Sequence, residues 1–208
     1  MRAMPNDFTS GLESLRAEIT AAAARLIVEH GADYATAKRK AAKQVLGGVK
    51  VRGEIMPGNA QIEDEVRIYN ELFMGESQPA RLLHLRTLAL QMMLELDRFS
   101  PYLTGAVLNG TAGEHSDIHL QLFADSAKDV EIYLLNQNIS FAVSETAHFK
   151  KRDEPVETVS FMWRKEGIHL ALYEIDDLRG ARKGPAAGRV ERADTEAVRA
   201  LVAKAEPS

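Results

Sequence analysis

The stretch that decides the fold is residues 108–125, LNGTAGEHSDIHLQLFAD. Its second half alternates, with Ile118, Leu120 and Leu122 on one face and polar side chains between them. This period of two predicts a β-strand with one buried and one open face. A turn of small residues joins this strand to the apolar segment 102–110, which we also predict to be a strand. Sheet structure is therefore expected on both sides of the turn.

The sequence before this stretch has the periodicity of helices. Apolar residues recur at three- and four-residue steps in segments 11–29, 33–48, 56–75 and 79–98, which predicts four helices. We place the N-cap of the third helix at Asn59. The fourth segment is apolar on nearly all sides, so this helix is expected in the core.

After residue 125 the pattern predicts one helix followed by three strands. Ser126 is the expected N-cap of the helix. Segments 139–149, 157–165 and 168–175 have the composition of strands. The predicted hairpin turn between the last two strands is Glu166-Gly167.

This order of elements predicts an α+β fold, with a mixed sheet that carries helices on one face. We predict a helical N-terminal region at residues 1–78 and the sheet domain at residues 79–178. Residues 179–208 are expected to form a basic loop and a short C-terminal helix that begins at Asp194.

Composition restricts the class of protein. Of the 208 residues, 45% are hydrophobic and 27% are charged, as in an ordinary globular protein. Cysteine is absent, which excludes disulfides, thiolate zinc sites and cysteine nucleophiles. The first residues lack the apolar core of a signal peptide, and no run of about 18 apolar residues occurs. We therefore expect a cytoplasmic protein that does not contact membranes.

Basic residues gather in two segments of this chain, whose net charge is −4. Residues 35–52 hold six Lys and Arg and no acid, and residues 179–192 hold five against one acid. Such segments either bind a polyanion such as RNA or form a solvated surface, and both interpretations stay open. The candidate RNA-binding residues are Lys38, Arg39, Lys40 and Lys43.

A long helix, a strand that ends in Gly-Thr, a small-residue turn and then the letters SDIHL form an order that resembles the DNA polymerase β-like nucleotidyltransferases, especially the minimal bacterial ones. The resemblance covers about residues 79–178 and rests on one short motif. The matching residues are Gly110, Thr111, Gly113, Ser116, Asp117, Ile118, His119 and Leu120. The resemblance implies transfer of a nucleoside monophosphate from ATP or another NTP to RNA, a protein or a small acceptor.

The resemblance also implies roles for individual residues. The turn would bind the nucleotide phosphates through Gly110, Thr111, Gly113 and Ser116. The basic segments would bind the acceptor or the pyrophosphate, and their C-terminal candidates are Arg179, Arg182 and Lys183. In the family, two carboxylates two residues apart on a strand hold Mg²⁺, and a third carboxylate on a neighbouring strand completes the site.

The metal ligands depart from the family pattern. Asp117 is present, but His119 occupies the second carboxylate position and His169 the third. Mg²⁺ prefers oxygen ligands, so these replacements are expected to weaken its binding. The same three residues, which are also the catalytic candidates, form an alternative two-histidine, one-carboxylate site for a transition metal. We expect the three side chains on one face of neighbouring strands.

Two function classes remain open. The first is an active nucleotidyltransferase that uses Mg²⁺ or a transition metal. The second is a catalytically degenerate protein of the same fold that acts as a nucleotide- or RNA-binding or regulatory module. P-loop, G-x-S-x-G and G-x-G-x-x-G motifs are absent. Trp163 and Phe161 either stack a base or pack in the core. The remaining histidines lack ligand spacing and are expected at the surface or at helix ends: His30, His84, His115 and His148.

Overall fold

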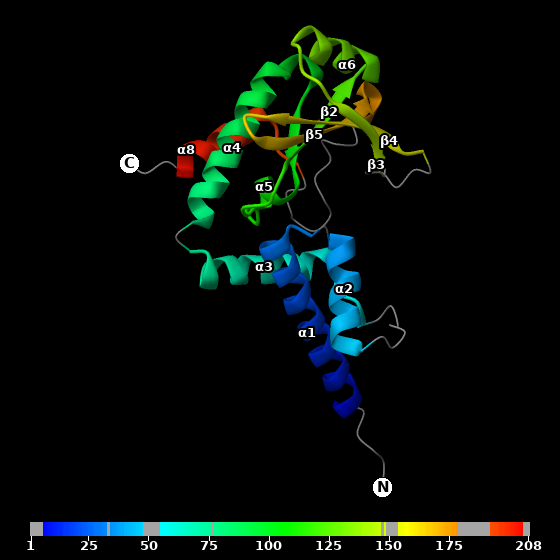
Figure 1. Cartoon of the computed structure of the whole chain (residues 1–208), viewed down its shortest axis with the longest axis vertical. Helices are drawn as coiled ribbons and strands as arrows, with labels where there is room; N and C mark the ends of the chain where they lie inside the picture. Colours follow the sequence, from blue (N-terminus) through cyan, green and yellow to red (C-terminus); the bar gives the residue numbers. More distant parts are fainter. Residues whose placement is uncertain are drawn as a thin grey trace. The chain divides into compact units, whose positions relative to one another are not determined.

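The computed structural model describes most of the chain and separates it into two compact units (Figure 1). One unit is Met1–Gln78 with Gly113–His115, and the other is Pro79–Ala112 with Ser116–Ser208. The described residues are 6–32, 34–47, 55–75, 77–146, 148, 154–178 and 192–205.

The described residues of the first unit form three helices, as the sequence predicts. They are α1 (Asn6–His30), α2 (Tyr34–Leu46) and α3 (Asn59–Phe73). Alanine dominates the core because small side chains allow helices to approach closely. The buried core residues are Ile19, Ala23, Ala24, Ala37, Ala41, Ala42, Ile62 and Val66. The N-cap of α3 is Gly58 rather than Asn59, and its N–H donates to Gln61 Oε1 at 2.9 Å.

The second unit contains a five-stranded mixed sheet. Its strands are β1 (Tyr102–Thr104), β2 (Ile118–Ala124), β3 (Ala142–Thr146), β4 (Val156–Trp163) and β5 (Glu166–Glu174). The order across the sheet is β1-β2-β5-β4-β3. Strands β2 and β5 are parallel, and the other neighbouring pairs are antiparallel.

Helices pack on one face of this sheet (Figure 1). The second unit contains α4 (Gln78–Glu95), α5 (Gly105–Asn109), α6 (Ala127–Asn136), α8 (Thr195–Ala205) and the single turns η2 (Asp97–Phe99) and η3 (Ile175–Asp177). The core joins Leu85 of α4 and Val130 of α6 to Leu120 and Leu170 of the two central strands. The predicted α+β class is confirmed. The predicted caps are present too, since Ser126 and Asp194 accept N–H groups of α6 and α8.

The segment predicted as the first strand is only partly a strand. After three residues of β1, Gly105 adopts a φ of 71° and the chain turns into the short helix α5. Only glycine enters this left-handed region readily, so Gly105 fixes the turn. Arg86 closes the other end of α5 by donating to the carbonyls of Val107 and Leu108, both at 3.0 Å. Burial lowers the pKa of Arg86.

The turn between β4 and β5 lies two residues earlier than predicted. Trp163 pairs with Glu166, which leaves Arg164 and Lys165 as the two loop residues. Both have positive φ, 50° and 72°, as a tight two-residue hairpin requires. Gly167 instead belongs to β5. Its lack of a side chain matters for the open face of the sheet.

Two expectations about buried aromatic side chains have different outcomes. Phe161 is buried in the core and Trp163 packs against that core, so these residues serve packing. His148 was expected at the surface, and that expectation is wrong. Its ring is buried, and Nε2 lies 3.0 Å from Asp177 Oδ2 and against Tyr173. A buried polar group needs such a partner, and sequence spacing did not reveal Asp177.

Glu166 should stabilise the second unit through Arg81 of α4. The two side chains form a two-point pair, with Arg81 Nη2 2.7 Å from Glu166 Oε2, and Glu166 is only 13% exposed. We expect Glu166→Gln to lower the free energy of unfolding by about 1–2 kcal/mol near pH 7. The single tryptophan, Trp163, reports this unfolding in urea.

The pH dependence of this stabilisation follows from the direction in which the pKa of Glu166 is shifted. The hydrogen bond from Arg81 lowers the pKa of Glu166 below its usual 4.5. The stabilisation is therefore present above that value and is lost as the pH falls through the folded-state pKa. Glu196→Gln is the control, because Glu196 forms an exposed pair with Arg199 and should cost about 0–0.5 kcal/mol. Equal losses in the two variants would contradict this account.

Candidate functional site

A row of polar side chains crosses the face of the sheet opposite the helices. Thr104 pairs with His119, His119 with His169, and His169 with Ser160. Residues directly opposite on neighbouring strands point to the same face, so four strands place these side chains in one line. The row alternates with Leu120 and Leu170, which face the helices.

Asp117 joins this row from two residues before His119. His169 Nε2 lies 3.0 Å from Asp117 Oδ2, and His169 Nδ1 lies 2.8 Å from Ser160 Oγ. The rings of His119 and His169 stack, with centroids 4.7 Å apart and planes 15° apart. The expectation that Asp117, His119 and His169 lie together on neighbouring strands is confirmed. Sequence reasoning missed Ser160, because alternation gives its face and not its partner strand.

Gly167 makes room for the Asp117 carboxylate over β5. A Cβ atom built on Gly167 would lie 2.4 Å from Asp117 Oδ1 and 2.6 Å from Asp117 Cγ. Any side chain at this position would therefore displace the carboxylate. The hydrogen bond between Asp117 and His169 thus depends on glycine at residue 167.

The predicted metal site is not formed by these three residues in this arrangement. Within the described ranges, no set of three or more His, Asp and Glu is arranged to hold a metal ion. A metal lies in the plane of the imidazole that binds it, along the nitrogen lone pair. Because the rings of His119 and His169 are stacked, their in-plane nitrogen lone pairs do not converge on one point. Asp117 is hydrogen-bonded to His169.

His119 differs from His169 in its surroundings. Loss of hydration lowers the pKa of His119, His169 lowers it further, and Asp117 opposes both. The side chain of His119 is nevertheless exposed to solvent, so its loss of hydration is partial. His119 is therefore a mainly neutral imidazole near pH 7 that keeps contact with solvent.

The turn residues assigned to phosphate binding have other partners. The N–H groups of Gly110 and Thr111 donate to the Ala106 carbonyl at 3.1 and 3.0 Å, and the Thr111 hydroxyl donates to Asn109 Oδ1 at 2.6 Å. These amides end α5 and are not presented to a ligand. The true strand-to-helix turn lies earlier, at Gly105.

The other substrate-binding candidates are dispersed. Ser116 immediately precedes Asp117, whereas Gly113 belongs to the unit of the three helices. Gly113 and Asp117 therefore belong to different compact units. Three basic candidates lie outside the described residues: Arg179, Arg182 and Lys183.

The basic segment of α2 is mostly open to solvent. Arg39, Lys40 and Lys43 are exposed, as expected for charges without buried partners. Lys38 is half-buried, and its Nζ donates to the Pro57 carbonyl at 3.4 Å. Three of the four predicted RNA-binding side chains are therefore accessible.

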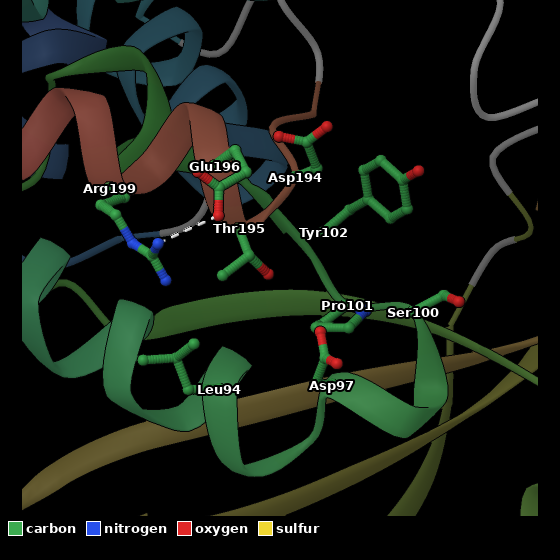
Figure 2. Close-up of a pocket in the computed structure, with 9 residues that line it drawn as sticks. All are labelled: Leu94, Asp97, Ser100, Pro101, Tyr102, Asp194, Thr195, Glu196 and Arg199. Carbon is green, nitrogen blue, oxygen red and sulfur yellow. Dashed lines mark ion pairs between the residues drawn. The ribbon is translucent and has the colours of Figure 1, made fainter.

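A cavity of about 540 Å³ lies beside the start of α8 (Figure 2). Carboxylates of Asp97, Asp194 and Glu196 surround it, and the guanidinium of Arg199 is paired with Glu196 at 3.1 Å. An acidic wall repels phosphate groups. The cavity therefore does not suit a nucleotide. Its remaining lining residues are Leu94, Ser100, Pro101, Tyr102 and Thr195.

Comparison with known proteins adds little. No family model matches the chain, and no curated protein matches its sequence. A solved structure, the GLD-2/RNP-8 complex, is similar at a TM-score of 0.31 and 18% identity, over 57% of this chain and 49% of that one. The present chain thus spans about half the length of the GLD-2/RNP-8 chain that it matches. A similarity this weak does not support an assignment of function. None of the helices in the described ranges has the length and hydropathy to span a bilayer.

Proposed function

We propose that this chain is a catalytically degenerate nucleotidyltransferase-like protein, which binds a nucleotide as a binding or regulatory module and does not transfer a nucleotidyl group with Mg²⁺. The observation that carries the proposal is the pairing of β2 with β5. It joins Asp117, His119 and His169, the three positions that the resemblance assigns to metal ligands. Two of these positions lack the oxygen ligands that Mg²⁺ requires.

Loss of the metal changes how the phosphates would be held. In a two-metal site, cations bridge the carboxylates and the triphosphate. Here His119 offers a ring N–H from the open face of the sheet. Neutral donors bind phosphate more weakly than a metal does, which suits a binding module rather than a catalyst.

Nucleotide binding should not depend on Mg²⁺. We expect ATP, titrated into the full chain by calorimetry, to bind with the same Kd within about twofold in EDTA and in Mg²⁺, because no metal bridges protein and phosphate. His119→Ala should weaken binding by about tenfold, since one hydrogen bond to a charged group is lost. His30→Ala, at an exposed histidine of α1, is the matched control.

Two outcomes would overturn the proposal. Binding that requires Mg²⁺, together with incorporation of labelled nucleotide that Asp117→Asn abolishes, would establish the active transferase instead. Absence of binding by ATP, GTP, CTP and UTP under both conditions would exclude the nucleotide module.

A further inference from the structure

Three side chains of the polar row form a connected chain of hydrogen bonds from a hydroxyl to a carboxylate. Ser160 Oγ lies 2.8 Å from His169 Nδ1, and His169 Nε2 lies 3.0 Å from Asp117 Oδ2. A carboxylate only accepts, so Nε2 carries the proton that it donates to Asp117. In the neutral ring Nδ1 is then the acceptor, and Ser160 donates its hydroxyl proton to it. The bonds thus select one tautomer of His169.

From this geometry we propose that Ser160 is a nucleophile, that His169 is its general base, and that Asp117 is the positioning residue that orients His169. The diagnostic arrangement of an activated serine is a hydroxyl bonded to an imidazole, whose other nitrogen is bonded to a third group. The usual roles of the two ring nitrogens are exchanged here. An imidazole accepts at one nitrogen and donates from the other in either orientation, so the relay is chemically the same.

The three groups are held by the sheet rather than by loops. Ser160 and His169 are directly paired residues of β4 and β5, and Asp117 lies at the start of β2. Strands hold side chains in nearly fixed directions, which keeps the reacting groups aligned. Gly167 supplies the space that the Asp117 carboxylate fills. The absence of a G-x-S-x-G turn therefore does not prevent activation, because a pleated row replaces that turn.

The substrate class that fits is a carboxylic ester with a good leaving group. Ser160 pairs with His169 on one side and with Ala142 on the other, so its own N–H belongs to the sheet. This amide is not free to stabilise an oxyanion, and the ester must itself be activated. The row lies on the face without packed helices, where Ser160 and His169 are partly exposed and a small ester reaches Ser160 Oγ.

The reaction is balanced by the three side chains and water. Ser160 Oγ forms a bond to the carbonyl carbon while its proton moves to His169 Nδ1. The bond from that carbon to the leaving oxygen breaks, the electron pair stays on this oxygen, and His169 returns the proton to it. Water then attacks the acyl-Ser160 ester, passes one proton to Nδ1, and releases the acid as Ser160 regains its proton.

A fluorophosphonate probe tests this inference, which goes beyond nucleotide binding and can fail independently of it. The probe loses fluoride when a serine oxygen attacks its phosphorus. We expect the full-length wild type to carry the adduct on Ser160, located by peptide mass spectrometry, and to release nitrophenol from p-nitrophenyl acetate. Ser160→Ala should lose the adduct. Ser144→Ala should keep it, because Ser144 on β3 bonds to a carbonyl and not to a histidine.

Gly167→Ala tests the positioning role without removing any reacting group. Its new Cβ should push the Asp117 carboxylate away from His169 and slow labelling of Ser160 by about tenfold or more. The ¹⁵N shifts of the His169 ring should change from one tautomer to a mixture, a readout that a merely structural role would not move. Labelling of Ser160→Ala at the wild-type rate, or equal labelling of many serines, would overturn the proposal. So would unchanged labelling of Gly167→Ala with an unchanged tautomer.

Discussion

The double variant His119→Asp/His169→Asp is expected to bind Mg²⁺ at least about tenfold more tightly than the wild type. The two positions are opposite each other in register, about 4.8 Å apart on neighbouring strands, and Asp117 lies two residues away on the same face. Three carboxylates would then surround one point, and a hard cation would find only oxygen donors. Calorimetry with Mg²⁺ and Mn²⁺ measures the gain.

The Tm of this double variant should depend on Mg²⁺. Without metal, three clustered carboxylates repel one another, so the Tm in EDTA should fall below that of the wild type. Added Mg²⁺ should restore part of the loss, because binding to the folded state stabilises it. His30→Asp, at an exposed histidine outside the row, is the control and should gain no metal binding. Tight Mg²⁺ binding by the wild type, with no gain in the double variant, would contradict the account.

Leu170→Ala is expected to lower the free energy of unfolding of the sheet unit by about 2–5 kcal/mol. Leu170 is fully buried at the centre of β5, where it joins the helix-facing core one residue after His169. Deleting its side chain leaves a cavity between the sheet and α4. Urea unfolding followed by the fluorescence of Trp163, which packs against the same core, gives the change in stability.

Val143→Ala is the matched control for this change. Val143 lies on the edge strand β3 and is 51% exposed, so its loss should cost less than about 0.5 kcal/mol. A small effect of Leu170→Ala, or an equal effect of both substitutions, would show that the central strands do not form the core described here.

The periodicity of the sequence predicts this sheet well where one face is buried. Alternation over Ile118 to Leu122 fixes which side chains face the helices, and the parallel strand at Ile168 obeys the same rule. The long apolar helix α4 is the partner of that face. These elements are predictable because burial of apolar surface is the main force that selects them.

Local backbone geometry was harder to predict than the strands. Residues 106–108 have apolar side chains that suit a strand, yet Gly105 turns this segment into a helix. The end of that helix is held by Arg86, which lies 21 and 22 positions before the carbonyls that it contacts. The hairpin turn uses Arg164 and Lys165 at positive φ, a conformation that their residue types do not predict. In both places a distant contact or a tight register decides the structure.

The candidate site was predictable in part. The resemblance to the nucleotidyltransferases predicted that Asp117, His119 and His169 lie together, because the topology of that family puts their two strands side by side, and the pairing of β2 with β5 confirms it. It did not reveal that Asp117 bonds to His169 or that Ser160 completes the row, since those contacts depend on the order of β5 and β4. The phosphate-binding turn was placed at Gly110 and Thr111, whose amides instead close α5.

The most direct test of the central claim is the response of the His119 and His169 ring signals to Mn²⁺. In a ¹⁵N-labelled wild-type protein, a paramagnetic ion held by these residues would broaden their signals selectively. If Asp117 is bonded to His169 and no metal site forms, both signals should stay as sharp as that of His30 when Mn²⁺ is added, and His169 Nε2 should remain protonated. Selective loss of the His119 and His169 signals at equimolar Mn²⁺ would contradict the account.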